Sequence, residues 1–247
     1  MIKLSKIFII ACVYSFIVIA SVAYAEEEVN ADQRFLYIGA EGGIVEPVVS
    51  KFRHKNSNTA ITLKRSGMYS AKIGYIFYPQ IAIEFSATYQ PKYRLHYVLP
   101  QQDLSNGLSI PKTPGKTRVI SNIYMVNLIY DFQEVKSFTP FVIFGAGIAQ
   151  VKVKSTSSRW DLMNIEYFKV RKTRTNCFAW QAGLGVSKYI TPNFSIDLAA
   201  KLQVAQNVKI NYDTLNIQSR QFVPANPIKK TIGIGEFGIG FTYRLPI

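Results

Sequence analysis

The sequence predicts an all-β fold, an eight-stranded antiparallel transmembrane β-barrel with short periplasmic turns and four long extracellular loops. Three observations lead to this fold class. The chain starts with a segment that has the features of a secretory signal. Eight later segments alternate apolar residues with polar or small ones. The connections between these segments are alternately short and long, as the two ends of a bacterial barrel require.

The leader, residues 1–25, has the three parts of a signal peptide. Lys3 and Lys6 form a basic region, an apolar run follows at 7–19, and Ala23-Tyr24-Ala25 is a small-x-small cleavage site. The apolar run is short for a membrane-spanning helix, which disfavours an uncleaved anchor. We therefore expect export followed by cleavage.

One alternative for the leader, and the possibility of a later membrane helix, are both disfavoured. A lipoprotein signal ending at Cys12 is disfavoured because it would cut the apolar run in half. No later stretch approaches the ~18 consecutive apolar residues of a membrane helix. We expect three parts of the chain: a cleaved signal peptide at 1–25, a periplasmic N-terminal segment at 26–34 and an outer-membrane barrel at 35–247.

Composition and cysteine content fit an exported protein. The formal net charge of the 247-residue chain is +14, and removal of Lys3 and Lys6 leaves +12. Export disfavours DNA as the partner of this charge. Cys177 is the one cysteine that remains after cleavage, so an intrachain disulfide is impossible and we expect a small buried side chain.

The last segment, 234–247, has the clearest strand pattern. One parity holds large apolar residues: Phe237, Ile239, Phe241, Tyr243 and Leu245. The other holds small or polar ones: Glu236, Gly238, Gly240, Thr242 and Arg244. Because alternate side chains of a strand point to opposite faces, this pattern suits a narrow barrel with lipid outside and a crowded polar lumen inside.

Three segments in the first half repeat the alternation, at 35–44, 69–77 and 81–90. Their apolar faces are Leu36, Ile38 and Ala40; Tyr69, Ala71, Ile73, Tyr75 and Phe77; and Ile81, Ile83, Phe85, Ala87 and Tyr89. Their other faces are Tyr37, Gly39 and Glu41; Ser70, Lys72 and Gly74; and Ala82, Glu84, Ser86 and Thr88. Each segment is near the ~9–11 residues that a tilted membrane strand needs.

Four more segments complete the set, at 120–132, 141–153, 178–189 and 194–204. The first alternates weakly, because Ile123, Met125 and Ile129 share the inward parity with Asn127 and Asp131. The other three place aromatic and aliphatic residues opposite polar or small ones: Gly145, Gly147 and Ala149; Gln181, Gly183, Gly185 and Ser187; and Ser195, Asp197, Lys201 and Gln203. Each signal is weak alone, and the repetition carries the prediction.

The connections give the orientation. Short turns fall at 78–80, 133–140 and 191–193, and long connections fall at 45–66, 91–118, 154–176 and 205–230. Bacterial barrels have short periplasmic turns and long outer loops, so both termini are expected in the periplasm.

Inward parity also collects charged residues from most of the strands. The predicted interior network is Glu41, Lys72, Glu84, Asp131, Asp197, Lys201, Glu236 and Arg244. In so narrow a barrel these side chains can pair across the lumen, so we expect a plugged interior whose charges hold the barrel together rather than a conducting pore.

The predicted loops are rich in Lys and Arg and poor in acids. Our first candidates for partner binding are Lys51, Arg53, Lys55, Lys64, Arg65, Arg159, Lys169, Arg171, Lys172 and Arg174. The run 169–174 (KVRKTR) is the densest cluster. Two interpretations stay open: the bases neutralise outer-leaflet lipid phosphates, or they bind acidic host surfaces, glycosaminoglycans or acidic parts of host proteins.

Four segments resemble the small outer-membrane β-barrel family of OmpA-like and Opa-like surface proteins, and the chain is most similar to the rickettsial adhesins. They are 127–132 (NLIYDF), 139–148 (TPFVIFGAGI), 178–186 (FAWQAGLGV) and 191–198 (TPNFSIDL). The resemblance implies an outer-membrane surface protein that binds host cells through serum or matrix proteins such as vitronectin. The alternative is a structural or porin-like barrel without a specific host partner. No binding residue transfers, because these motifs lie in strands.

Catalysis is not expected. The two histidines, His54 and His96, both fall in predicted loops, and His54 has basic neighbours and no orienting carboxylate. Two separated histidines and one cysteine do not form a metal site. We therefore expect no enzyme activity, no cofactor, no nucleic-acid partner and a monomeric barrel in the lipid of the outer membrane.

Overall fold

The computed structural model describes nine stretches of the chain: 34–48, 51–54, 57–99, 102–103, 109–110, 113–160, 165–216, 221–224 and 226–246. The predicted signal peptide at 1–25, and the predicted N-terminal segment at 26–34 apart from Arg34, lie outside these stretches. In the part of the chain that is described, no helix has the length and apolar character to cross a membrane.

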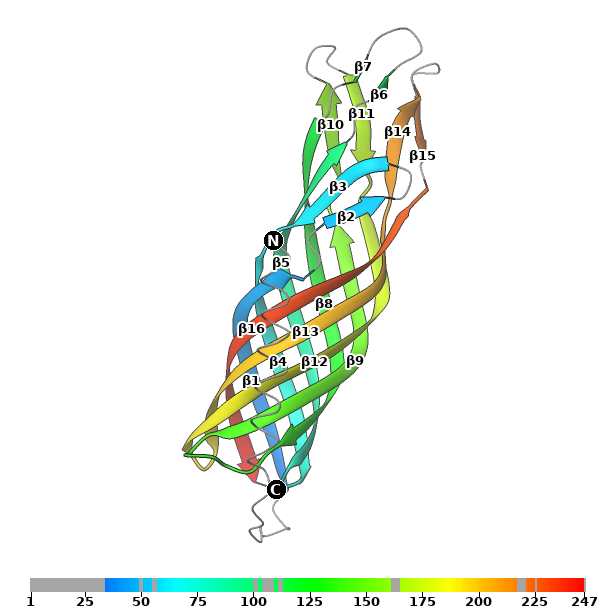
Figure 1. The fold of residues 1–247 in the computed structure, drawn as a ribbon. Coiled ribbons are helices and arrows are strands. Elements are labelled where there is room, and N and C mark those ends of the chain that lie inside the picture. The colour runs from blue at the N-terminus through cyan, green and yellow to red at the C-terminus, as the bar shows by residue number, and fades with distance from the viewer. Residues whose placement is uncertain are drawn as a thin grey trace.

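Eight long strands form a closed antiparallel ring, which confirms the predicted fold class (Figure 1). In chain order they are β1 (Phe35–Pro47), β4 (Ser66–Tyr78), β5 (Ile81–Leu99), β8 (Thr113–Asp131), β9 (Thr139–Val153), β12 (Thr173–Thr191), β13 (Phe194–Ile210) and β16 (Ile228–Pro246). Each pairs with its neighbour in the chain, and the pairing of β1 with β16 joins the two ends of the series.

The ring strands are longer than predicted, and the predicted long loops contain further strands. Short strands β2 (Lys51–His54) and β3 (Ser57–Leu63) extend the sheet, with β3 paired to the upper part of β5. A separate four-stranded sheet, here called the head sheet, has the order β10 (Thr156–Trp160), β11 (Ile165–Val170), β14 (Tyr212–Asn216) and β15 (Gln221–Pro224). The pair β6 (Gln102–Asp103) and β7 (Ser109–Ile110) stands apart from both.

The lower part of the barrel carries an outward apolar belt. Exposed members of the belt include Ile38, Ile73, Ile83, Phe85, Val126, Leu128, Phe144, Ile148, Phe178, Leu198, Ile239 and Phe241. On β4 the belt runs from Tyr69 to Tyr78, nine residue steps, which is about 30 Å along the strand and about 23 Å in height at a tilt of ~40°. This height matches the ~25 Å apolar band of outer-membrane barrels.

Above the belt, the polarity of the two faces reverses. On β12 the outward residues change from Phe178 to Asn176 and Arg174, while the inward Cys177 is buried. On β9 the inward Val151 and Val153 are buried in a core with residues from β8, including Ile123 and Met125. Outside the membrane a barrel must keep apolar groups away from water, so apolar side chains turn inward.

This reversal explains why the sequence reading ended the strands too early. The prediction looked for strands with apolar residues on the outward face. Above the belt the outward residues are polar, so the same strands no longer fit that pattern. The weak alternation of 120–132 has two causes. Ile123 and Met125 belong to the upper core, and Ile129 packs in a separate, lower cluster around Tyr37, Ile76 and Ala82.

Inward glycines leave room for the lumen side chains, as the sequence parity predicted. A Cβ atom on Gly74 would overlap the ring of Tyr37, and one on Gly145 would overlap the amide of Asn127. At Gly147 the obstacle is the carbonyl oxygen of Tyr124 on the neighbouring strand. Backbone in a closed ring cannot move aside as a flexible side chain can.

We predict that Gly147→Ala lowers the free energy of unfolding by about 1–3 kcal/mol, because the new methyl group overpacks the contact between β8 and β9. Gly42→Ala is the matched control, since a Cβ atom there meets nothing within 4 Å. Urea unfolding of both refolded variants in lipid vesicles measures the difference. Equal midpoints for the two variants would contradict this account of the glycine.

Candidate functional site

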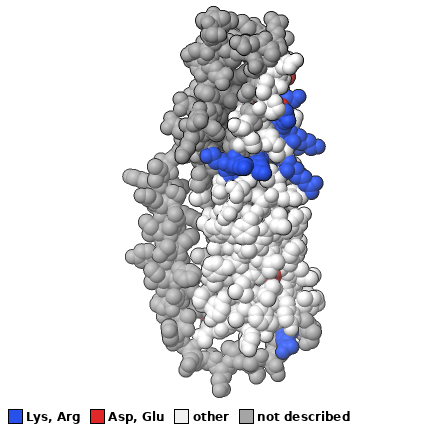
Figure 2. All heavy atoms as spheres, turned by 90° about the vertical axis from the view of Figure 1, so that its right-hand side faces the viewer, with Lys and Arg blue, Asp and Glu red and all other residues white. Residues whose placement is uncertain are grey.

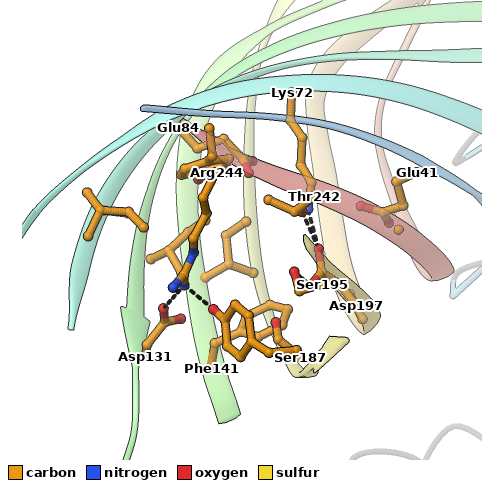
Figure 3. A pocket seen from close by; sticks show the side chains of 18 of the residues that line it. Glu41, Lys72, Glu84, Asp131, Phe141, Ser187, Ser195, Asp197, Thr242 and Arg244 are labelled. Atoms are coloured by element: carbon orange, nitrogen blue, oxygen red, sulfur yellow. Dashed lines mark hydrogen bonds and ion pairs between the residues drawn. The ribbon is translucent and has the colours of Figure 1, made fainter. Parts of the chain in front are cut away.

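The structure places all eight residues of the predicted interior network on the lumen side of the barrel. Five of them are buried, namely Glu41, Glu84, Asp197, Lys201 and Glu236. The other three, Lys72, Asp131 and Arg244, line a cavity near the end that holds the short turns (Figure 3). The cavity has a volume of about 60 Å³, room for about two water molecules.

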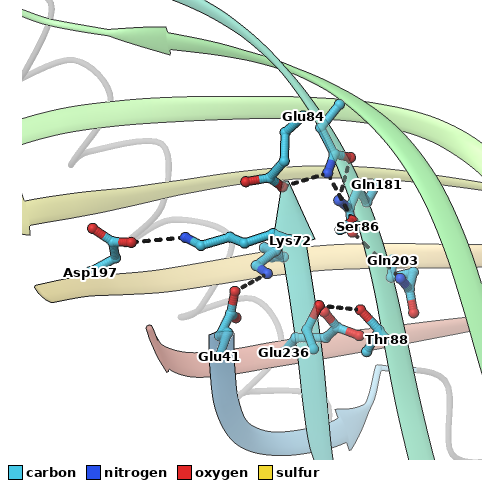
Figure 4. Close-up of polar contacts among 12 residues, drawn as sticks. Glu41, Lys72, Glu84, Ser86, Thr88, Gln181, Asp197, Gln203 and Glu236 are labelled. Atoms are coloured by element: carbon cyan, nitrogen blue, oxygen red, sulfur yellow. Dashed lines mark hydrogen bonds and ion pairs between the residues drawn. The ribbon is translucent and has the colours of Figure 1, made fainter. Parts of the chain in front are cut away.

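Two ion pairs, one buried and one partly buried, cross the lumen between strands far apart in sequence (Figure 4). Lys201 Nζ donates a hydrogen bond of 2.7 Å to Glu41 Oε2, and Lys72 Nζ donates one of 2.8 Å to Asp197 Oδ2. The Asp197 carboxylate also accepts hydrogen bonds from Ser195 and Thr242. These bonds give the charges solvation that the narrow lumen does not supply.

Near the short turns, Arg244 on β16 contacts residues at the ends of β8 and β12. Its guanidinium is 3.9 Å from Asp131 Oδ2, donates a hydrogen bond to the Tyr189 hydroxyl and lies over the Tyr189 ring, with 4.3 Å between Cζ and the ring centroid. All three residues line the cavity, and Figure 3 shows Arg244 beside Asp131 there.

A chain of neutral amides connects the charges, and the sequence reading did not identify it as a network. Asn127 Nδ2 donates to Glu84 Oε1 at 2.8 Å, and Gln181 Nε2 donates to Asn127 Oδ1 at 2.7 Å. Gln203 continues the chain to Gln181, and Gln90 donates both to Gln203 and, at 2.6 Å, to Glu236 Oε1.

Inward parity had already placed Asn127, Gln181 and Gln203 on the lumen face, so their position could be read from the sequence but their connections could not. Gln90 continues the inward parity of Ala82, Glu84, Ser86 and Thr88 at the end of its predicted segment, so its position could be inferred in the same way. The chain of amides spans the lumen and fills it at mid-height, where Gln90, Asn127, Gln203 and Glu236 are at most 1% exposed.

The outer basic residues do not form one cluster. In the run 169–174, Lys169 is exposed on β11, Arg171 and Lys172 are exposed between β11 and β12, and Arg174 is exposed on β12. Thr173 and Val170 of the same run are buried. The densest cluster in the sequence is therefore spread along the junction between the head sheet and the ring.

Two of the predicted partner-binding residues already have acidic partners. Arg171 Nε lies 2.7 Å from Asp213 Oδ2, and this hydrogen bond raises the pKa of the guanidinium. Arg65 Nε lies 3.2 Å from Glu46 Oε2 at an exposed position, where an ion pair contributes little. Lys64 is also exposed.

Lys51, Arg53, Lys55 and Arg159 complete the predicted set, and their side chains lie outside the described part of the structure. On the face that Figure 2 displays, Lys and Arg gather above a broad zone that is nearly free of charge. The basic surface and the apolar belt are thus separate layers.

No chemistry beyond binding is visible in the described residues. Within them, no group of three or more His, Cys, Asp or Glu side chains is placed to hold a metal ion. His96 stands opposite Lys116 in the pairing of β5 with β8. The side chain of His54 lies outside the description, so the absence of catalysis stays a prediction.

Comparisons with known proteins bear on the family and the cellular location of the chain. No protein-family model matches it. The uncharacterized protein RP788 of Rickettsia prowazekii is 66% identical over 179 residues, which are 72% of this chain and 99% of that protein. Outer membrane protein PagN of Salmonella typhimurium is 35% identical over 96 residues, 39% of each chain.

A solved structure shares the fold. The outer membrane protein OprG from Pseudomonas aeruginosa superposes with a TM-score of 0.51 and 14% identity, over 87% of this chain and 97% of that one. Together with the outward apolar belt, these findings establish a bacterial outer-membrane β-barrel with its long connections on the extracellular side. The predicted localisation is confirmed.

We predict that Lys201→Met costs about 3–5 kcal/mol of unfolding free energy, because it leaves the buried Glu41 without its cation. The added change Glu41→Gln recovers part of this loss, so the two changes are strongly non-additive. Urea unfolding of the single and double variants in vesicles gives the coupling energy.

Arg65→Met serves as the control, since the exposed pair with Glu46 contributes at most about 1 kcal/mol. If Lys201→Met and Arg65→Met cost the same, the interior ion pair is not a determinant of barrel stability.

Proposed function

The chain belongs to the same family as the Rickettsia prowazekii protein RP788, and we propose that it is an outer-membrane adhesin whose head sheet binds acidic groups on host cells. The observation that carries the proposal is the ordered structure above the membrane. A barrel that only spans the membrane needs strands of ~9–11 residues. Here β5, β8, β12 and β16 each have 19 residues, and the head sheet lies beyond them.

The head sheet is made of paired strands in the connections between ring strands, so these connections are not irregular loops. Strands β10 and β11 lie in the chain between β9 and β12, and β14 and β15 lie between β13 and β16. Phe168 on β11 and Tyr212 on β14 stack with 5.3 Å between their ring centroids. An ordered surface loses less conformational entropy on binding than a flexible loop does.

The surface of the head has the chemistry of a protein-binding patch. Lys169 and Lys172 are exposed bases, and Phe222 and Val223 on the edge strand β15 are 37% and 44% exposed. Bases give attraction to acidic partners over a distance, and exposed apolar side chains add contact area at short range.

The porin-like alternative is less well supported. The ion pairs and the chain of amides described above occupy the lumen, and narrow barrels fill with side chains. A structural barrel without a partner would not require ordered strands so far above the belt. We therefore place the activity on the outside of the molecule.

The partner class follows from charge. Acidic glycans such as glycosaminoglycans and acidic segments of serum or matrix proteins, of which vitronectin is one, fit the exposed bases Lys169 and Lys172 on the head sheet and at its junction with the ring. Of the remaining predicted contact residues, Lys51 and Arg53 lie on β2 and Arg159 lies on β10, and Lys55 is outside the described residues. All four stay in the proposed binding set.

We predict that the double variant Lys169→Ala/Lys172→Ala binds heparin-coated surfaces and intact host cells at least about tenfold more weakly than the unchanged protein. The loss should shrink as the ionic strength rises, because screening weakens the attraction in both proteins. Titration of refolded protein in nanodiscs measures the affinity.

The matched control is Lys136→Ala/Lys188→Ala, which removes two exposed bases at the periplasmic end. Undiminished binding by the head variant, with the control also unchanged, would remove the proposed mechanism of adhesion.

Single-channel recording provides an independent test of the alternative. We expect no ionic conductance from the unchanged barrel in a planar bilayer, because the lumen is filled by paired side chains. Stable conductance steps would favour the porin-like function.

A further inference from the structure

A set of basic side chains forms a layer directly above the apolar belt, on the outward face of five adjacent ring strands. We call this layer the basic girdle, and its members are Lys116, Arg118, Lys152, Lys154, Arg174, Lys209 and Lys229. It lies below the head sheet on β8, β9, β12, β13 and β16, with Lys154 one residue beyond the end of β9, and part of it is visible above the uncharged zone in Figure 2.

The pairing register stacks the outward side chains in rows. Ile148 on β9 stands opposite Phe178 on β12 and forms an apolar row. Two residues higher, Gln150 accompanies Asn176, and Gln150 Nε2 donates to Asn176 Oδ1 at 3.3 Å. Apolar groups thus give way to amides at the border of the belt.

The next row is basic. Lys152 stands opposite Arg174 in the pairing of β9 with β12, and Lys209 stands opposite Lys229 in that of β13 with β16. Directly opposed side chains on one face have Cβ atoms about 4.5–5.5 Å apart, and like charges at this distance repel. Each opposed pair would be stabilised by an anion held between its members.

The protein itself does not supply that anion within the described residues. The acids of the five strands are Asp131, Asp197 and Glu236, and all three lie in the lumen. Lys152, Arg174, Lys209 and Lys229 have no ion pair with any acid of the described part of the chain. The uncompensated charge faces the surroundings of the barrel.

The height of the girdle identifies those surroundings. Arg174 is four residues above Phe178, about 13 Å along the strand and about 10 Å in height at a tilt of ~40°. The headgroup layer extends about 5–8 Å beyond the hydrocarbon core on each side. Long Lys and Arg side chains can bend toward that layer, so their charged ends reach it.

We propose that the basic girdle binds phosphate groups of anionic lipid in the outer leaflet, with one phosphate held between the members of each opposed pair. A phosphate accepts several charge-assisted hydrogen bonds, which converts the repulsion within a pair into joint attraction. The girdle sets the depth of the barrel in the membrane, and this role does not depend on adhesion by the head. Arg174, which the sequence grouped with the partner-binding residues, belongs to the girdle.

The test uses the full barrel in nanodiscs of phosphatidylcholine, with and without 20 mol% diphosphoryl lipid A, at about 1 mM EDTA to remove bridging cations. The girdle variant is Lys152→Gln/Arg174→Gln/Lys209→Gln/Lys229→Gln. The control variant, Lys64→Gln/Lys136→Gln/Lys169→Gln/Lys188→Gln, removes the same net charge from exposed positions outside the girdle. Lipid phosphorus retained after detergent extraction and the thermal midpoint are measured.

We expect the unchanged and control proteins to retain lipid A and to have a higher thermal midpoint in its presence, and the girdle variant to retain at least about tenfold less and lose the midpoint shift. Equal retention by both variants overturns the proposal. So does loss of retention on adding inorganic phosphate at ~10 mM, because the site would then bind free phosphate rather than lipid.

Folding of each variant is checked by the electrophoretic shift between heated and unheated samples. A conservative variant, Lys152→Arg/Lys209→Arg/Lys229→Arg, keeps every charge and should retain lipid A as the unchanged protein does. If the conservative variant also loses retention while folded, the charges are not the cause and the proposal fails.

Discussion

The constraint on which the structure depends is the narrowness of an eight-stranded ring. Its lumen has no room for bulk water, so the inward polar groups bind other lumen side chains instead of solvent. Lys201 with Glu41 and Lys72 with Asp197 do so as ion pairs. The hydrogen-bonded amides around Asn127 satisfy polar groups in the rest of the lumen. Because the interior side chains are bound to one another, the adhesion that we propose uses the outer surface.

The second organising feature is the change of solvent along the strands. Hydrocarbon surrounds the lower ring and water surrounds the upper one, and the same strands satisfy both by exchanging the polarity of their two faces. Cys177 illustrates the exchange: it is buried in the upper core, and its neighbours Asn176 and Phe178 face outward, one polar and one apolar. On β12, the change from hydrocarbon to water therefore falls between two successive outward residues, Phe178 and Asn176.

The exterior divides into three layers with separate tasks. The apolar belt holds the barrel in the membrane, the basic girdle lies at the level of the lipid phosphates, and the head sheet presents Lys169, Lys172, Phe222 and Val223 beyond them. Charge in the loops, which the sequence offered as one feature with two interpretations, thus resolves into two populations. Their distance from the belt distinguishes a lipid ligand from a cellular one.

The sequence by itself determined the fold class, the eight strands and the inward parity of residues such as Glu41 and Gly147, because alternation of side chains is a local property of a strand. It did not determine where strands end, since the apolar-outward pattern disappears at Asn176 although the backbone pairing continues. Only the tertiary structure decided which lumen side chains meet. It also placed Lys152 opposite Arg174, because the register between strands depends on closure of the whole ring.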